Sequence, residues 1–259
     1  MKICLIAAVS ACALVAQSVP PSPAGLIARA IAAQTTQTQR GWKYTCREDH
    51  EQQQLDKNGK PDGPPSTKTY DHIMLEGENY SKLILIDGKP LDAKTQKKVD
   101  EGLEKTRAER RRNGFLSFHR TVSLGGLDLL MRLFDNKVTG EETVLGRKTW
   151  RMESEPKPGY KPASKNEEDA MSSRRVSWFD QEDGIRIKET SIFVRATNSF
   201  QPGTTFDLEY IKIGEDWLLS DAVMHVELKM MPLVGGRVES HQRYSDYKRF
   251  SVDSTLTPQ

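Results

Sequence analysis

The fold of this chain is indicated most clearly by the stretch AVMHVELKM, residues 222–230. Every second residue in it is apolar, and most of the residues between are polar. The apolar set is Ala222, Met224, Val226, Leu228 and Met230. Successive side chains of a strand point to opposite faces, so this pattern predicts a strand with one apolar and one solvated face.

Turn signals divide the rest of the chain into runs of about 8–12 residues, the spacing of an all-β meander. Lys57-Asn58-Gly59-Lys60 predicts a type I′ hairpin turn, because Asn-Gly accepts positive φ angles. Further turn candidates are Glu76-Gly77, Asp87-Gly88, Leu145-Gly146, Asp183-Gly184, Gly214-Glu215-Asp216 and Gly235-Gly236. Strands joined by tight turns are antiparallel neighbours, so we expect a mainly antiparallel β fold with a few helices.

A long charged segment, Asp92 to Arg112, interrupts the β pattern and is rich in Lys, Glu and Arg. Asp92 is suited to cap the first turn of a helix there. The basic end, Arg110 to Arg112, has two interpretations: favourable charge at a helix C-terminus, or transient contact with an anionic membrane surface. Further along, Ser164 is suited to cap a short helix in a polar insertion.

A short apolar segment, Gly126 to Phe134, also has helical spacing. Leu127, Leu130, Met131 and Phe134 follow each other three or four positions apart, which predicts a helix with one apolar face. We consider two roles for it: a helix packed on the sheet to close the core, or a movable lid over an apolar cavity. A curved antiparallel sheet under such a lid is suited to hold an acyl chain.

The N-terminus has the features of a secretion signal. Met1-Lys2 is followed by an apolar run to Ala16, which is shorter than the about 20 residues needed to span a bilayer. Small residues at Ala16 and Ser18 predict cleavage before Val19, with cleavage after Ala13 as an alternative. We therefore expect a signal peptide over residues 1–18 and a periplasmic protein. The alternative is a lipid anchor at Cys12, at the end of the lipobox-like Val9-Ser10-Ala11-Cys12.

The expected domain boundaries follow from composition. Residues 19–40 are expected to be a linker, since they contain Pro-rich and Gln/Thr-rich stretches; a short helix is considered over Ala24 to Ala33. The β domain is expected over residues 41–253 and a C-terminal tail over residues 254–259.

Several function classes lack support in the sequence. The formal net charge of +2 gives no reason to expect nucleic-acid binding. The phosphate-loop, dinucleotide, hydrolase-elbow and zinc-protease motifs are absent, and the five histidines lack metal-ligand spacing. We expect no enzyme activity, no cofactor, no metal site and a monomer. Cys46, the only cysteine after the signal, is interpreted as a small core-facing residue.

Short motifs in a consistent order resemble one bacterial family, the LolA-like, outer-membrane lipoprotein-sorting proteins. The motifs are Gly41-Trp42-Lys43-Tyr44-Thr45, Leu55-Asp56-Lys57-Asn58-Gly59-Lys60, Asp87-Gly88-Lys89-Pro90-Leu91, Gly140-Glu141-Glu142, Gly146-Arg147-Lys148-Thr149-Trp150, Pro158-Gly159-Tyr160-Lys161-Pro162, Trp178-Phe179-Asp180 and Tyr244-Ser245-Asp246-Tyr247-Lys248-Arg249-Phe250. The resemblance covers about residues 41 to 250. It implies an open, incomplete β-barrel of about eleven strands, with helices against its concave face.

The resemblance also implies a function, a non-catalytic periplasmic carrier or binding protein for lipid or lipoprotein acyl chains in outer-membrane biogenesis. An envelope-stress sensor or protein-interaction module, with envelope proteins as partners, is the alternative. No family-specific residue can be placed on this chain. The candidate ligand-binding residues come from the patterns above: Leu127, Leu130, Met131 and Phe134 in the lid, Met224, Val226, Leu228 and Met230 on the sheet, and Trp178.

Overall fold

A computed structural model describes residues 19–40, 43–56, 58–113, 126–198, 200–228 and 236–250. The helices are α1 (Pro23–Gln39), α2 (Ala93–Asn113), α3 (Leu127–Leu133) and α4 (Lys165–Ala170). The strands are β1 (Lys43–Leu55), β2 (Ser66–Leu75), β3 (Glu78–Ile86), β4 (Lys89–Pro90), β5 (Phe134–Val144), β6 (Arg147–Pro156), β7 (Ser173–Asp180), β8 (Arg186–Phe193), β9 (Thr205–Ile213), β10 (Asp216–Leu228) and β11 (Gly236–Phe250).

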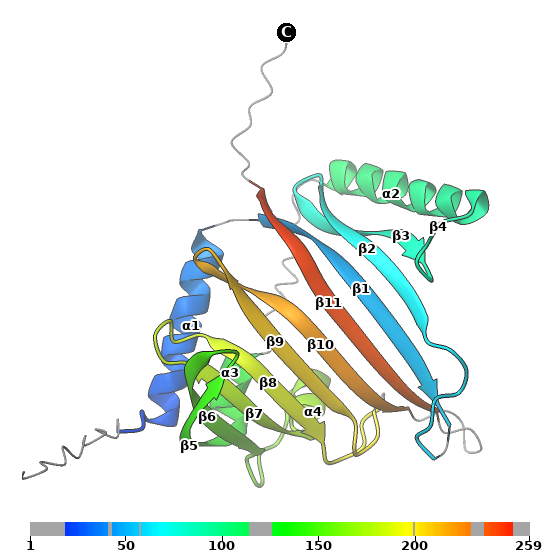
Figure 1. Cartoon of the computed structure of the whole chain (residues 1–259). Coiled ribbons are helices and arrows are strands. Elements are labelled where there is room, and N and C mark those ends of the chain that lie inside the picture. Colours follow the sequence, from blue (N-terminus) through cyan, green and yellow to red (C-terminus); the bar gives the residue numbers. More distant parts are fainter. Residues whose placement is uncertain are drawn as a thin grey trace, which may run out of the picture.

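All eleven strands form one sheet, in the order β4-β3-β2-β1-β11-β10-β9-β8-β7-β6-β5 (Figure 1). Every neighbouring pair is antiparallel. β1 and β11, the first and last strands along the chain, pair with each other in the middle of the sheet. Every other neighbouring pair consists of strands that are consecutive in the chain. Within the described residues β4 and β5 are the two edges of the sheet, so the sheet is open. The predicted antiparallel open-barrel architecture is confirmed.

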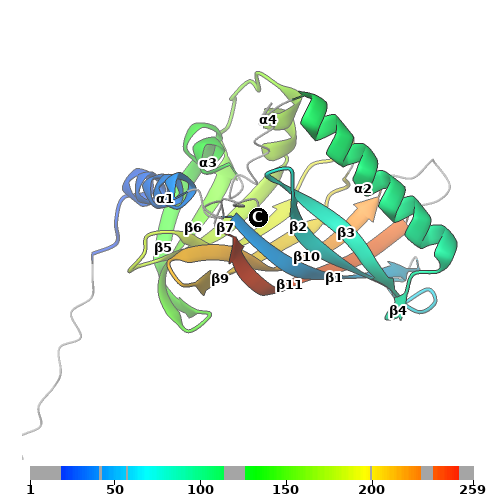
Figure 2. The same cartoon turned by 90° about the horizontal axis from the view of Figure 1, so that it is seen from above.

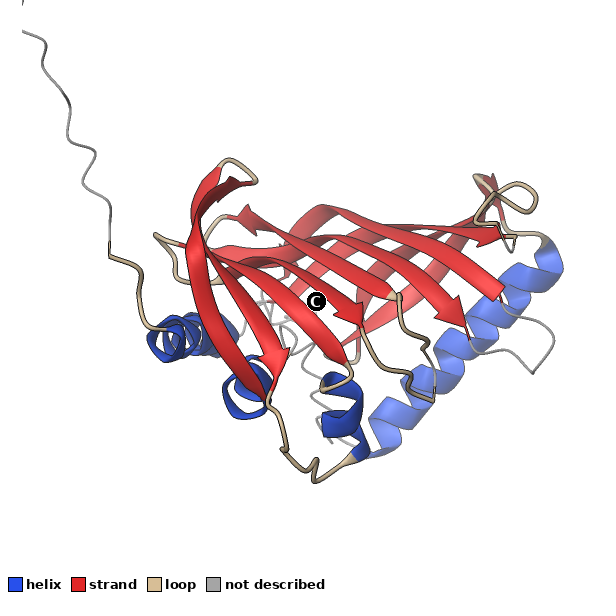
Figure 3. Cartoon of the chain, turned by 90° about the horizontal axis from the view of Figure 1, so that it is seen from below, coloured by secondary structure: helices blue, strands red, loops and turns tan. Residues whose placement is uncertain are grey.

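The sheet is curved, and the helices lie on its concave side (Figures 2 and 3). α1, α3 and α4 gather at the end formed by β5, β6 and β7. α2 lies at the other end, where it packs on β3. The predicted placement of helices on the concave face is confirmed.

Tight turns join most of these strands at the predicted positions. Leu145-Gly146 joins β5 and β6 with both φ angles positive (51° and 74°), as a type I′ turn requires. The turn at Asn58-Gly59 differs in detail from the predicted two-residue turn. Gly59 has a positive φ of 77°, but its N–H donates to Asp56 O at 3.0 Å, and Asp56 N donates to Lys60 O at 2.7 Å. The Asp56 carboxylate also accepts hydrogen bonds from the N–H groups of Asn58 and Lys60. This side-chain-stabilised loop replaces the two-residue turn.

The N-terminal segment differs from the expected linker. α1 spans 17 residues, and its side chains Leu26, Ile27 and Ala30 are buried in the core. Ser22 caps the helix by accepting from Gly25 N at 3.1 Å. Burial against α3 stabilises a helix whose Gln- and Thr-rich end has low intrinsic propensity. The folded domain therefore begins before residue 41.

The predicted helix caps at Asp92 and Ser164 are present. Asp92 Oδ1 accepts from Thr95 N at 2.7 Å, and this hydrogen bond holds the pKa of the Asp92 carboxyl below its usual range. Ser164 Oγ accepts from Glu167 N at 3.3 Å at the start of α4. Polar side chains therefore set the N-termini of α2 and α4.

The buried apolar core sits under α1 and α3. One cluster joins α1 and α3 to β5, β6 and β7, and a second lies beside the C-terminal part of α1. The first contains Leu26, Ile27, Ala30, Leu127, Leu130, Leu133, Phe134, Trp150, Met152, Met171 and Phe179. The second contains Ile185, Ile187, Tyr210 and Trp217. Among the described residues, no helix is long and apolar enough to cross a membrane.

Candidate ligand-binding face

The face of the sheet that carries the buried core is called the inner face here. It can be followed from strand to strand, because residues paired across neighbouring strands share a face. Ser177 of β7 pairs with the core residue Met152 on one side and with Glu189 on the other. Glu189 pairs with Leu208, and Leu208 pairs with Ala222 of β10. Ala222, Met224 and Val226, the described side chains of the predicted apolar face, therefore lie on the inner face.

The residues predicted to form a lid lie mostly in the core. Leu127, Leu130 and Phe134 are buried in the cluster under α1 and α3. Met131 is 39% exposed and does not belong to that cluster. The contacts of this helix with α1 and β5 correspond to the core-closing role considered for it.

The sheet residues of the prediction lie further along the inner face. Met224 pairs with Phe206 and Ser240, and Val226 pairs with Val238. Both side chains are half-buried. Leu228 ends β10 in the same register, but its side chain lies outside the described residues, as does all of Met230.

Trp178 is not brought together with the other candidates. It pairs with Arg151 and Lys188, which places it on the opposite, convex face from its neighbour Phe179. Its indole N–H donates to Glu142 Oε2 at 2.6 Å, and the Lys188 ammonium lies 5.7 Å from the ring centroid. Charged groups therefore surround Trp178.

Three phenylalanines form an aromatic cluster that the sequence analysis did not propose as a site. The Phe193, Phe200 and Phe206 ring centroids are 5.1 to 5.8 Å apart, in tilted and edge-to-face arrangements. All three side chains are half-buried. Phe206 pairs with Met224, so the cluster continues the apolar surface of β10 onto β9 and β8. The alternation of Phe206, Leu208 and Tyr210 was the available signal.

The inner face is more polar on β1, β2 and β11. The His72 imidazole joins Glu48 Oε2 (2.7 Å) to the Ser81 hydroxyl (3.1 Å), and its ring is 5.9 Å from that of Tyr244. Burial raises the pKa of the neighbouring Cys46 thiol to about 11, which leaves it protonated near neutral pH.

A buried charged group interrupts the inner face between the core and the aromatic cluster. It consists of Arg175 on β7 and of Arg186 and Glu189 on β8. Phe179 pairs with Arg186 across a β-bulge, and this irregularity lets Arg186 share the inner face with Glu189. Sequence reasoning missed the group, because regular alternation would place Arg186 and Glu189 on opposite faces.

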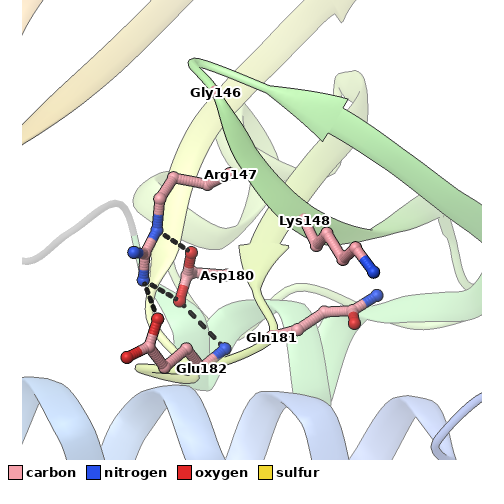
Figure 4. A pocket seen from close by; sticks show the side chains of 6 residues that line it. All are labelled: Gly146, Arg147, Lys148, Asp180, Gln181 and Glu182. Carbon is pink, nitrogen blue, oxygen red and sulfur yellow. Dashed lines mark hydrogen bonds and ion pairs between the residues drawn. The ribbon is translucent and has the colours of Figure 1, made fainter.

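A surface pocket of about 380 Å³ lies on another part of the molecule and is lined by Gly146, Arg147, Lys148, Asp180, Gln181 and Glu182 (Figure 4). Arg147 donates from Nε and Nη2 to the two carboxylate oxygens of Asp180, at 2.7 and 3.0 Å. These interactions raise the pKa of Arg147, and Glu182 pairs with it as well. The ion pairs of Arg147 with Asp180 and Glu182 therefore fasten the start of β6 to the end of β7 and the turn that follows it.

Within the part of the chain that the structure describes, no group of three His, Cys, Asp or Glu side chains could hold a metal ion. The inner face instead carries three kinds of side chain. These are half-buried apolar side chains, polar side chains on β1, β2 and β11, and a buried charged group. Such a combination can bind an amphiphilic ligand, whose apolar and polar parts need different partners.

No protein-family model matches the chain, and no curated protein matches it. Similar solved structures include a DUF1329 family protein from Desulfovibrio piger (14% identity, 90% of this chain and 94% of that chain, TM-score 0.38). Others are a putative outer membrane lipoprotein-sorting protein domain from Vibrio parahaemolyticus (12%, 89% and 95%, 0.34) and a LolA superfamily protein from Nitrosomonas europaea (9%, 93% and 99%, 0.33).

Proposed function

We propose that the protein is an exported, non-catalytic binding or carrier protein that holds an acyl chain on the inner face of its sheet. The observation that carries this proposal is the apolar surface formed by Phe193, Phe206, Met224 and Val226. These side chains share one face and are only half-buried. An acyl chain would remove this surface from water, at about 0.8 kcal/mol for each buried CH₂ group.

The arrangement of the helices supports the same proposal. Their main contacts with the sheet are at its two ends, where α1 and α3 pack on β5 and α2 packs on β3. α1 also reaches Trp217 through a side-chain hydrogen bond from Gln37. Phe206 and Met224 lie further along β9 and β10, away from that contact. The described helices therefore leave these side chains partly accessible to a ligand.

Export to the periplasm is part of the proposal and rests on residues 1–18, which lie outside the described residues. We expect N-terminal sequencing of the protein from a periplasmic extract to begin at Val19. Substitution of Cys12 by Ala should leave both the amount of periplasmic protein and its N-terminal residue unchanged. A protein that begins at a lipid-modified Cys12 and fractionates with membranes would contradict soluble export.

The ligand proposal is tested by native mass spectrometry and lipid extraction of protein purified from the periplasm, followed by titration with a fluorescent fatty acid. We expect a bound acyl species and saturable uptake of the probe. Absence of both would overturn the proposal. A stoichiometric envelope protein in place of any lipid would favour the interaction-module alternative.

A matched pair of variants assigns the binding to one face. Met224→Gln introduces a polar group of similar size on the inner face, whereas Ile211→Gln does so on the convex face, where Ile211 is 46% exposed. We expect about a tenfold loss of probe affinity for Met224→Gln, equivalent to about 1.4 kcal/mol. Ile211→Gln should bind as the wild type does. Equal losses in both variants would contradict binding on the inner face.

A further inference from the structure

The buried charged group of Arg175, Arg186 and Glu189 carries more positive than negative charge. Arg186 is 0% exposed and Glu189 is 5% exposed. Two guanidinium groups and one carboxylate leave a formal net charge of +1 among these three side chains. Burial raises the pKa of the Tyr210 hydroxyl, which is close enough to Arg186 and Glu189 for their charges to act on it. A tyrosine hydroxyl is neutral near pH 7 and does not balance the excess charge.

Both oxygens of the Glu189 carboxylate are already engaged. Oε2 accepts from Arg186 Nη1 and from the Ser177 hydroxyl, the latter at 3.3 Å. Oε1 lies 3.7 Å from Arg175 Nη1. Glu189 therefore pairs with one end of Arg186 and lies beside Arg175, but it does not reach the remaining nitrogens.

Among the residues that the structure describes, three buried guanidinium nitrogens have no hydrogen-bond partner: Arg186 Nε, Arg186 Nη2 and Arg175 Nε. Buried N–H groups in proteins are nearly always paired, so three in one place require an explanation. Nε and Nη2 of one arginine donate in parallel from the same edge, which matches the spacing of two oxygens of a carboxylate or phosphate.

Arg147 provides an internal reference for this geometry. The same two atoms, Nε and Nη2, donate to the two oxygens of Asp180. In Arg186 the same edge has no hydrogen-bond partner in the part of the chain that the structure describes. The two arginines thus present the same donor edge, one to an internal carboxylate and the other to the inner face of the sheet.

We propose that the Nε–Nη2 edge of Arg186, together with Arg175 Nε, binds an oxyanion, the carboxylate or phosphate group of the bound ligand. The inference rests on the proposed function and adds the polar end of the ligand to it. Arg175 is the accessible member of the group, with 13% of its side chain exposed. Its guanidinium carbon lies 5.2 Å from the centroid of the Phe134 ring, which orients it along the inner face.

The neighbouring residues give the ligand its direction. Ser191 pairs with Arg175 on one side and with Phe206 on the other. One cross-strand row therefore leads from the arginines to the aromatic cluster. A ligand whose oxyanion is bound at Arg186 would place its apolar tail over Phe206 and Met224. The ligand class is an anionic amphiphile, such as a fatty acid or a phospholipid.

The test compares cis-parinaric acid, a fluorescent fatty acid, with its methyl ester, which has the same tail and no charge. We expect the wild type to bind the acid about tenfold or more tightly than the ester, the effect of a charge-assisted bidentate contact. Arg186→Lys keeps the charge but loses the parallel donors, so the preference should fall to about one while ester binding persists. Arg147→Lys is the matched control and should retain the wild-type preference.

Inorganic phosphate separates the two sources of an oxyanion. A rise in Tm of the wild type with phosphate, absent in Arg186→Lys, would support the anion site and indicate that it accepts a free anion as well as a headgroup. If the acid and the ester bind the wild type equally well, the anion site is overturned and acyl-chain binding stands. If neither binds, the proposed function itself fails. The wild-type comparison decides the question even if Arg186→Lys does not fold.

Discussion

The two ends of the sheet differ in how they are covered. Under α1 and α3, strands β5 to β10 contribute to two clusters of buried apolar side chains. Neither cluster contains a residue of β1, β2, β3 or β11, and the inner face there carries Glu48, His72 and Ser240. The first region supplies most of the apolar burial that stabilises the fold, and the surface proposed to bind a ligand lies between the two regions.

The largest expected effect is in the covered region. Leu130→Ala removes a side chain that is 0% exposed between α1 and the sheet, so we expect the free energy of unfolding to fall by about 2–5 kcal/mol. The half-buried Met224→Ala should cost about 1 kcal/mol. Urea denaturation followed by tryptophan fluorescence measures both. A greater loss of unfolding free energy for Met224→Ala than for Leu130→Ala would contradict the view that the region under α1 and α3 supplies most of the stability.

The second prediction concerns the thiol of the more polar region. Burial raises the pKa of Cys46 from 9.0 to about 11, so its thiolate fraction at pH 8 is about 100-fold below that of a free thiol. Alkylation of folded protein by iodoacetamide should be slower by about that factor than alkylation in urea, as measured by mass spectrometry. Comparable rates in both states would show that Cys46 is accessible and that this region opens readily.

The same shift has a consequence for stability. Because the pKa of Cys46 is higher in the folded state, its contribution to stability is present below pH 9 and is lost as the pH rises towards about 11. Cys46→Ala should remove this part of the alkaline destabilisation.

A smaller effect is expected where α1 is fastened to the sheet. The Gln37 amide donates to Trp217 O at 2.9 Å and accepts from Trp217 N at 3.0 Å. Gln37→Ala removes both hydrogen bonds, and we expect a loss of about 1–2 kcal/mol in the free energy of unfolding. Gln34→Ala, one turn earlier on α1, is the control and should change stability little. Equal losses of stability in Gln37→Ala and Gln34→Ala would mean that the Gln37–Trp217 hydrogen bonds contribute nothing specific.

The smallest effect is expected at α2. Glu76 lies 3.8 Å from Arg107 Nε and 2.9 Å from Arg111 Nη2, and Arg110 donates to the carbonyls of Leu75 and Glu78. Glu76→Gln should lower stability by only about 0.2–1 kcal/mol, because the ion pairs are partly solvated. The loss should shrink in high salt when Tm is measured against NaCl concentration. A larger loss, or one independent of salt, would mean that α2 contributes as much as the covered region does.

Local patterns were sufficient to predict much of the fold. Alternation at residues 222–228 predicted a strand, and paired turn residues such as Leu145-Gly146 predicted tight connections. The caps at Asp92 and Ser164 were predictable because they depend on a side chain and the adjacent backbone only. The predicted linker at residues 19–40 was wrong, because Leu26, Ile27 and Ala30 form the buried face of a helix. Their burial depends on packing against α3, which lies far away in the sequence.

The candidate site was less predictable than the fold. Leu127 and Leu130 have the same spacing whether a helix closes a core or covers a ligand, and only their packing against α1 distinguishes the two arrangements. Trp178 was also a candidate, yet strand pairing places it among charges on the convex face. In both cases the deciding contacts come from residues distant in the chain.

The sequence by itself determined the period of the strands, the turns, the helix caps and the antiparallel class, because each depends on interactions between near neighbours. Tertiary structure alone decided which faces are covered and which charges are buried. The bulge between β7 and β8 shows the reason most directly: one irregular pairing brings Arg186 to the same face as Glu189, where no pattern of residue types would place it. The site proposed for an anionic ligand depends on that pairing.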